Sequence, residues 1–168
     1  FKAGEVTATR IRNAAKERDL FLIEDAGRKY VLKVDRGGWG FGGESASERF
    51  LLRLLRGPFY SRLMERVRLA RQRGCDMIQQ MHLVAEKRTL HFCHEAVIIL
   101  DYLEGKMLID AGDLDQYRPR IREAMIKLHE GGLALCDVSV YNYLVDDEGK
   151  LKIIDLVCRG NFHVDRVK

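Results

Sequence analysis

Two short stretches decide the fold prediction: residues 135–142 read LCDVSVYN, and residues 153–156 read IIDL. Asp137 and Asn142 stand in the spacing D-x-x-x-x-N, and Asp155 follows later in the chain. Carboxylate and amide oxygens are suitable ligands for Mg²⁺, so these three side chains are typical of a site that handles phosphate groups. The same residues could also belong to ordinary acidic turns. The order of the elements upstream has to decide between the two interpretations.

The composition indicates a folded domain with a local excess of positive charge. The 168 residues are 46% hydrophobic and carry a formal net charge of +4, so the chain can bury a core. Eight arginines against one acid, Glu65, occur in residues 49–73. This segment predicts either a positive face for phosphates, nucleic acid or an anionic membrane surface, or a solvated helix surface.

Cysteine spacing and hydropathy exclude several classes of protein. Cys75, Cys93, Cys136 and Cys158 are not in C-x-x-C spacing, so neither a zinc ribbon nor a disulfide-dense fold is expected. We expect free thiols and a cytoplasmic location. The strongly apolar run at residues 97–100 is too short to span a membrane, and the first residues do not resemble a signal peptide. Any membrane association is therefore expected to be peripheral.

The clearest predicted helix covers residues 116–130. Apolar side chains recur there at helical spacing, with Pro119 near the start and the Gly131-Gly132 pair just past the end. A hairpin is expected next, with strands at residues 143–145 and 151–154 around the turn DDEGK.

The remaining pattern predicts strands, two helices and further strands upstream. A glycine-rich connector at residues 37–43 leads to a helix that begins near Ser45 or Ser47, and a second helix is expected at 59–73. Residues 104–115 are expected to form a linker. Strands are predicted at residues 5–10, 19–24, 29–34, 81–85 and 96–100. This order predicts an α+β fold, with a small antiparallel-sheet lobe at residues 1–103 and a mainly helical lobe at 104–168.

The strand at residues 29–34, KYVLKV, supplies a candidate phosphate-binding cation. Strand alternation puts Val31 and Lys33 on one face, so Lys33 can point into a cleft beside a small apolar residue that would cover an adenine ring. The alternative is a surface lysine on an edge strand.

An acidic partner for Lys33 is expected on the first helix. Glu48 lies on its apolar face, where a carboxylate needs a partner, and Lys33 is the natural one. Glu65 lies off the apolar stripe of the second helix and ranks lower, with Glu44 as the fallback.

With these parts in order, the chain resembles the protein-kinase-like superfamily over most of residues 5–158. The segments RKYVLKV, SERFLLRLLRGPFYSRLM, AEKRTL, IILDYLEG and KIIDL are similar to the bacterial lipopolysaccharide core heptose kinases. The resemblance implies a bilobal fold that binds ATP and Mg²⁺. Because thirteen residues follow Asp155, the substrate-binding part of the helical lobe is expected to be shortened, as a truncated C-lobe.

The resemblance also implies roles for nucleotide-binding residues. Lys33 would bind the α- and β-phosphates and pair with Glu48. Val31 would cover the adenine ring, and Asp101 and Leu103 would present backbone groups to it.

The acceptor and metal roles follow from the same resemblance. Asp137 would orient the sugar hydroxyl, and Asn142 and Asp155 would hold Mg²⁺. The expected substrate is the glycolipid lipopolysaccharide, with a heptose hydroxyl of its inner core as acceptor. The enzyme would act at the inner face of the inner membrane, where the arginine-rich segment could contact the anionic bilayer.

Three alternatives remain open from the sequence. The first is a kinase for a protein, an aminoglycoside or another small alcohol. The second is a non-catalytic pseudokinase scaffold, because no G-x-G-x-x-G joins the first two strands, and Leu135 and Ser139 stand where the superfamily usually has a His and a basic residue. An RNA-binding module ranks last, since the arginines are not interleaved with stacking aromatic residues, and we expect no nucleic-acid partner.

Overall fold

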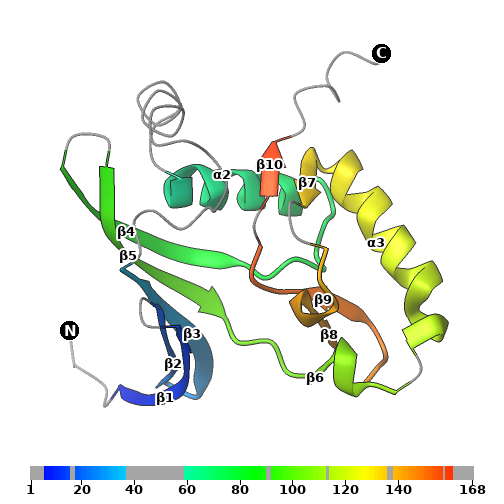
Figure 1. Cartoon of the computed structure of the whole chain (residues 1–168), viewed down its shortest axis with the longest axis horizontal. Coiled ribbons are helices and arrows are strands. Elements are labelled where there is room, and N and C mark those ends of the chain that lie inside the picture. Colours follow the sequence, from blue (N-terminus) through cyan, green and yellow to red (C-terminus); the bar gives the residue numbers. More distant parts are fainter. Residues whose placement is uncertain are drawn as a thin grey trace. The chain divides into compact units, whose positions relative to one another are not determined.

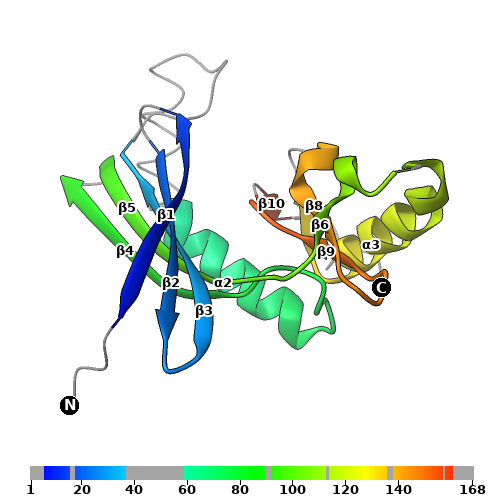
Figure 2. The same cartoon turned by 90° about the horizontal axis from the view of Figure 1, so that it is seen from below.

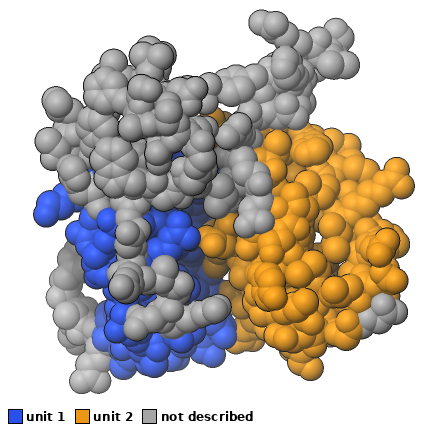
Figure 3. All heavy atoms as spheres, viewed as in Figure 1, with its two compact units in different colours: residues 1–64, 81–102 blue, residues 65–80, 103–168 orange. Residues whose placement is uncertain are grey.

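A computed structural model of the chain (Figure 1) describes residues 6–15, 18–36, 59–89, 92–112, 114–135, 138–156 and 158–160. The chain divides into two compact units (Figure 3). Unit 1 comprises residues 1–64 and 81–102, and unit 2 comprises residues 65–80 and 103–168. Both units combine strands with helical segments, as the α+β prediction requires.

Unit 1 is built on a five-stranded antiparallel sheet in the order β1-β2-β3-β5-β4. A tight turn joins β2 to β3, and its two central residues, Ala26 and Gly27, have positive φ angles of 47° and 77°. Such turns match the right-handed twist of the flanking strands. The strands are β1 (Thr7–Ala15), β2 (Arg18–Asp25), β3 (Arg28–Asp35), β4 (Met81–Thr89) and β5 (Phe92–Asp101).

All five strands of this sheet were predicted, but the real strands are longer. β1 continues past Arg10, through Asn13, into the segment between the first two predicted strands. It stays paired with β2 because irregularities in the register absorb extra residues, and Asn13 lies opposite Asp19. The predicted first helix and the glycine-rich connector lie outside the described residues.

Helix α2 (Phe59–Gln72) confirms the second predicted helix, and a buried carboxylate anchors its first turn. Glu86 on β4 has a side chain with no exposed surface. It accepts hydrogen bonds from the Tyr60 amide at 3.1 Å and from the Ser61 hydroxyl at 2.7 Å, and it pairs with Arg88. A carboxylate at a helix N-terminus satisfies amides that have no partner within the helix. Glu86 therefore fixes the start of α2 to the sheet.

Replacing Glu86 by alanine should destabilise the chain by about 2–3 kcal/mol, since partly buried donors would lose their acceptor. Urea unfolding would measure this change. Glu95→Ala on the neighbouring strand is the matched control, because the Glu95 side chain is 37% exposed and its loss should change the free energy of unfolding little. Equal effects of the two substitutions would contradict the anchoring role.

Asp19 on β2 is a second buried carboxylate of unit 1. Hydrogen bonds from Arg36 and then from Arg10 hold the pKa of this carboxyl below its usual range. The folded chain therefore keeps Asp19 charged at a pH at which an unfolded aspartate, with a pKa of about 3.9, would be protonated.

Asp19 should make the stability of the chain sensitive to acid. Its stabilisation is complete above pH ~4 and is lost as the pH falls towards the lower folded-state pKa. Unfolding curves recorded between neutral and acidic pH should show a smaller acid-induced loss for Asp19→Asn than for the wild type. Asp25→Asn, an exposed change at the end of the same strand, should leave the pH dependence unaltered. Identical pH dependence in Asp19→Asn would disprove this contribution.

Unit 2 combines the later turns of α2 and a second long helix, α3, with short strands and 3-10 turns. In this unit, β6, β8 and β9 form an antiparallel sheet, and β7 pairs with β10. Helix α3 lies beside the β6-β8-β9 sheet (Figure 2). The elements are β6 (Lys106–Met107), η1 (Leu108–Asp110), η2 (Leu114–Tyr117), α3 (Arg118–Glu130), β7 (Leu133–Leu135), η3 (Val140–Asn142), β8 (Tyr143–Val145), β9 (Leu151–Ile153) and β10 (Cys158–Gly160).

The predicted helix and hairpin of unit 2 are confirmed. Helix α3 begins two residues later than predicted, at Arg118, since Tyr117 belongs to the preceding 3-10 turn. Ala124 and Leu128 of the predicted stripe are buried. In the hairpin, the Asp146 carboxylate accepts hydrogen bonds from two turn amides, which explains why this acidic segment reverses the chain.

Residues 65–80 group with unit 2, whereas the sequence division placed them with residues 1–64. Their apolar side chains enter its core: Ile78 is buried and bridges to Ile153 on β9, and the Gln79 amide donates to the Ile153 carbonyl at 3.0 Å. Buried Cys75 donates to the Lys127 carbonyl at 2.9 Å and remains a free thiol. Burial raises the pKa of this thiol, which therefore stays protonated.

Several arginines of the basic segment have structural partners. Arg68 forms a two-point ion pair with Glu65, in which the hydrogen bonds are 2.7 and 3.0 Å long. Arg71 donates to the Ile78 carbonyl at 2.6 Å, and Arg73 donates to the Gly131 carbonyl at 3.3 Å. The guanidinium groups of Arg71 and Arg73 thus hold loops of unit 2 in place. Among the described residues, no helix is long and apolar enough to cross a membrane.

Candidate functional site

Lys33 lies on β3, the central strand of the unit 1 sheet, rather than on an edge strand. Across the neighbouring strands it is paired with Leu20 and Ile98. Cross-strand partners share one face of a sheet, so the half-buried Lys33 stem is flanked by apolar side chains. A lysine in this position can lay its stem along the sheet while its ammonium group stays available to a ligand.

Val31 lies on the same sheet face as Lys33, as predicted from strand alternation. Its cross-strand partners are Leu22 and Leu100. Together these side chains make an apolar surface next to the lysine, which has the chemistry needed to cover a flat apolar ring.

Asp101 and Leu103 lie where the chain passes from unit 1 to unit 2. Asp101 is the last residue of β5, and Leu103 follows outside any strand. The Asp101 carboxylate contacts the His82 ring, with 2.5 Å between Oδ1 and Nε2. The amide of Tyr102 donates to the Lys29 carbonyl at 3.3 Å. The backbone proposed to meet adenine is therefore tied to two strands of the sheet.

Asn142 and Asp155 are brought together inside unit 2. Asn142 ends the 3-10 turn η3, and its carbonyl accepts a hydrogen bond of 2.9 Å from the amide of Ile154, the residue before Asp155. The exposed Asp155 has a φ of 48°. Residues other than glycine rarely adopt this left-handed conformation, although aspartate and asparagine tolerate it, and it is often found at functional sites.

Ser139 gives the loop before Asn142 a fixed shape. Its hydroxyl accepts a hydrogen bond of 3.4 Å from the Tyr141 amide, and its carbonyl accepts one of 2.9 Å from the Asn142 amide. A serine here is a cap of the turn. This local role accounts for a residue that stands where the superfamily usually has a basic side chain.

The donor set of unit 2 fits a magnesium ion. In the described ranges, no group of three or more His, Cys, Asp or Glu side chains could hold a metal ion. Mg²⁺, however, is usually bound through one or two carboxylates together with substrate phosphates. Asp155 and Asn142 offer hard oxygen ligands of this kind, so the predicted metal ligands are chemically suitable.

Two predicted site residues, Asp137 and Glu48, lie outside the described residues, as does the fallback Glu44. Glu65, the lower-ranked acid, forms an ion pair with Arg68 on the surface of α2.

Sequence reasoning did not select the polar cluster beside Lys33. Asp35, two residues further along β3, is buried and accepts hydrogen bonds from Arg18 and from the Tyr60 hydroxyl. The strand that carries Lys33 is thereby joined to α2. The sequence offered one signal for this cluster: Asp35 continues the alternation of Val31 and Lys33 along the strand. That signal is too weak to interpret alone.

Comparison with known proteins shows which family the chain is similar to. A family model described as lipopolysaccharide core biosynthesis protein (WaaY) matches residues 5–166. The lipopolysaccharide core heptose(II) kinase WaaY of Escherichia coli strain K12 is 28% identical over 158 residues, and another Escherichia coli WaaY is 26% identical over 137 residues. These matches cover 93% and 80% of this chain but 65% and 56% of the relatives. The chain thus spans less than two thirds of the curated relatives' length.

Solved structures show a likeness of fold. A co-crystal structure of WbdD with the kinase inhibitor LY294002 has a TM-score of 0.53 and 19% identity, and covers 84% of this chain and 30% of WbdD. A second WbdD crystal structure has a TM-score of 0.57 and 17% identity, and covers 95% and 35%. The predicted α+β, protein-kinase-like fold class is confirmed by this likeness.

Proposed function

Since the chain belongs to the WaaY family of lipopolysaccharide core biosynthesis proteins, we propose that it is an ATP-dependent kinase for a heptose hydroxyl of the lipopolysaccharide inner core. The observation that carries the proposal is the hydrogen bond that joins the Asn142 carbonyl to the amide of the residue before Asp155, because it holds the backbone of the two proposed metal ligands close together. The names of the two Escherichia coli relatives support heptose as the acceptor.

The nucleotide would be held mainly by unit 1. Lys33 would bind the α- and β-phosphates with its ammonium group and pair with Glu48. Val31 would cover one side of the adenine ring, while backbone groups of Asp101 and Leu103 would bind its polar edge. The central position of Lys33 in the sheet supports this role, since its strand is paired with a neighbouring strand on both sides.

The reacting groups would lie beside the loop that ends at Asn142. Asp137 would accept a hydrogen bond from the heptose hydroxyl and take its proton as the oxygen bonds to the γ-phosphorus of ATP and the bond to the β-γ bridging oxygen breaks. Asn142 and Asp155 would hold Mg²⁺, which when bound neutralises charge on the phosphates. We retain residues 1–103 and 104–168 as the proposed kinase-like lobes.

A peripheral contact with the inner membrane surface forms part of the proposal. Its support is the basic segment of residues 49–73, which has eight arginines against one acid, Glu65. Sedimentation with vesicles should show salt-sensitive binding to anionic lipid and none to neutral lipid. Equal binding to both would remove this part of the proposal.

The substrate assignment is tested by the mass of the core oligosaccharide. Cells that depend on this protein should carry a phosphate on the inner core with the wild-type protein and lose it with Asp137→Ala. An unchanged core mass would exclude the proposed substrate. Parallel assays of purified protein with labelled ATP and peptide or aminoglycoside acceptors would identify a kinase of another specificity.

A further inference from the structure

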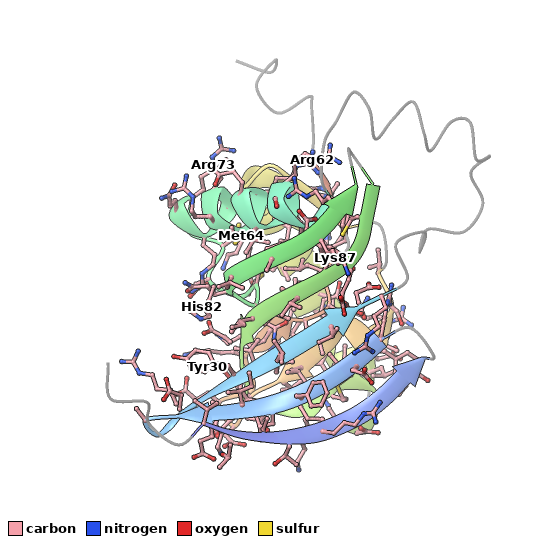
Figure 4. The ribbon with its side chains drawn as sticks, turned by 90° about the vertical axis from the view of Figure 1, so that its left-hand side faces the viewer. Tyr30, Arg62, Met64, Arg73, His82 and Lys87 are labelled. Carbon is pink, nitrogen blue, oxygen red and sulfur yellow. The ribbon has the colours of Figure 1, made fainter. Side chains whose placement is uncertain are left out.

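His82 and Asp101 form a side-chain pair at the end of the unit 1 sheet. The His82 Nε2 atom lies 2.5 Å from Asp101 Oδ1, and the two side chains are 35% and 33% exposed. The Tyr30 ring meets the His82 ring edge-on, with 5.5 Å between the ring centres. Figure 4 shows these two rings next to each other at one end of the sheet. The contacts join β3 and β4 to the last residue of β5.

A β-bulge gives His82 its position. Met81 pairs with Leu100, whereas Leu83 pairs with Ile99, so His82 is an extra residue on β4. Bulges redirect side chains and are frequent beside functional sites. Here the extra residue brings the His82 imidazole to Asp101, a contact that a regular strand register would not produce.

Tyr102, the residue after Asp101, is held by Lys29 of β3, the strand on the other side of β5 from β4. Its amide donates to the Lys29 carbonyl at 3.3 Å, and the Lys29 ammonium lies 5.7 Å from the centre of its ring. The distance is within the range of a cation–π contact. Asp101 is thus fixed through its side chain and Tyr102 through its backbone and ring, at the point where the chain leaves unit 1.

We propose that His82 is a positioning residue for nucleobase recognition: by holding Asp101, it fixes the backbone of residues 101–103. The inference rests on the proposed function. Each backbone residue offers one donor and one acceptor, whereas adenine donates through its exocyclic amine and guanine accepts at the equivalent oxygen. A fixed backbone can therefore distinguish the two bases, and a displaced one distinguishes them less well.

Calorimetric titration of Mg·ATP and Mg·GTP into the full chain tests this role. His82→Ala should weaken ATP binding by up to about fivefold and leave GTP binding nearly unchanged, so that the ATP-to-GTP preference falls. The melting temperature should stay close to that of the wild type, because a partly exposed pair contributes little to folding. His82→Gln, which can still donate to Asp101, should recover most of the preference. Lys87→Ala, an exposed change on the same strand, should retain it.

The possible failures are distinguishable. Wild-type protein that binds ATP, together with a His82→Ala variant of equal base preference, would overturn the inference and leave the proposed function standing. A loss of ATP binding together with a marked fall in the melting temperature, neither of which is recovered in His82→Gln, would also overturn the inference. That result would show that His82 has a merely structural role. Wild-type protein that binds neither nucleotide would overturn both.

Discussion

Asp155→Asn is expected to lower the rate of phosphate transfer by about 10³-fold, because the substitution removes the single carboxylate charge that would hold the metal beside Asn142. Stabilisation of transferring phosphate by a bound cation amounts to several kcal/mol, and about 4 kcal/mol corresponds to this factor. The fold should survive, since asparagine tolerates the left-handed backbone found at this position, where φ is 48°.

Single-turnover transfer from labelled ATP would measure the effect of Asp155→Asn. Asp147→Asn is the matched control, since Asp147 is an exposed residue of the hairpin turn in the same unit, and it should transfer phosphate at the wild-type rate. Retention of more than a tenth of wild-type activity in Asp155→Asn, with the control intact, would contradict the metal-binding role of this carboxylate.

Lys33→Met should lower kcat/KM for ATP by about 10²–10³-fold, the usual loss when one preorganised donor to a developing charge is removed. Stability should respond differently. Methionine keeps a long apolar stem between Leu20 and Ile98, but the substitution leaves the carboxylate proposed to pair with Lys33 without its counter-charge. We therefore expect a modest fall in the melting temperature.

Steady-state kinetics and thermal unfolding of the same Lys33→Met preparation would separate these effects. Lys87→Met, at an exposed position of β4, provides the control for loss of a lysine charge from the sheet. If Lys33→Met kept wild-type kinetics, Lys33 would be a structural residue, and the phosphate-binding role would have to be assigned elsewhere.

Local patterns predicted the elements whose signals lie within one segment. Helix α3 was found because its buried residues recur at helical spacing between Pro119 and the Gly131-Gly132 pair. The hairpin of β8 and β9 was found from its acidic, glycine-containing turn. The motif-based resemblance to the heptose kinase family is likewise confirmed by the family match together with the two Escherichia coli relatives.

Features that depend on long-range pairing could not be predicted. The three-residue strands β7 and β10 have no periodic signal of their own and exist because they pair across more than twenty residues of sequence. The His82–Asp101 contact depends on a bulge, and a register irregularity leaves no mark in the pattern of apolar residues. The charge of Arg71 was visible in the sequence, but its hydrogen bond to the Ile78 carbonyl was not.

For the candidate site, the sequence supplied residue types and the structure supplied part of their arrangement. The spacing of Asn142 and Asp155 in the sequence could have arisen by chance. The hydrogen bond between the Ile154 amide and the Asn142 carbonyl shows that the backbone segments of these two residues do meet in the fold. Likewise, the central strand position of Lys33 removes the edge-strand alternative. The roles of Asp137 and Glu48 remain predictions from the sequence.

The most direct test of the central claim is a calorimetric titration of ATP into the purified chain, with Mg²⁺ and with the metal chelated. Saturable binding that is strengthened by Mg²⁺ in the wild type, with the metal-dependent part lost in Asp155→Asn and kept in Asp147→Asn, is the predicted result. Absence of ATP binding, or binding that depends on Mg²⁺ equally in all three proteins, would contradict the proposed Mg·ATP site.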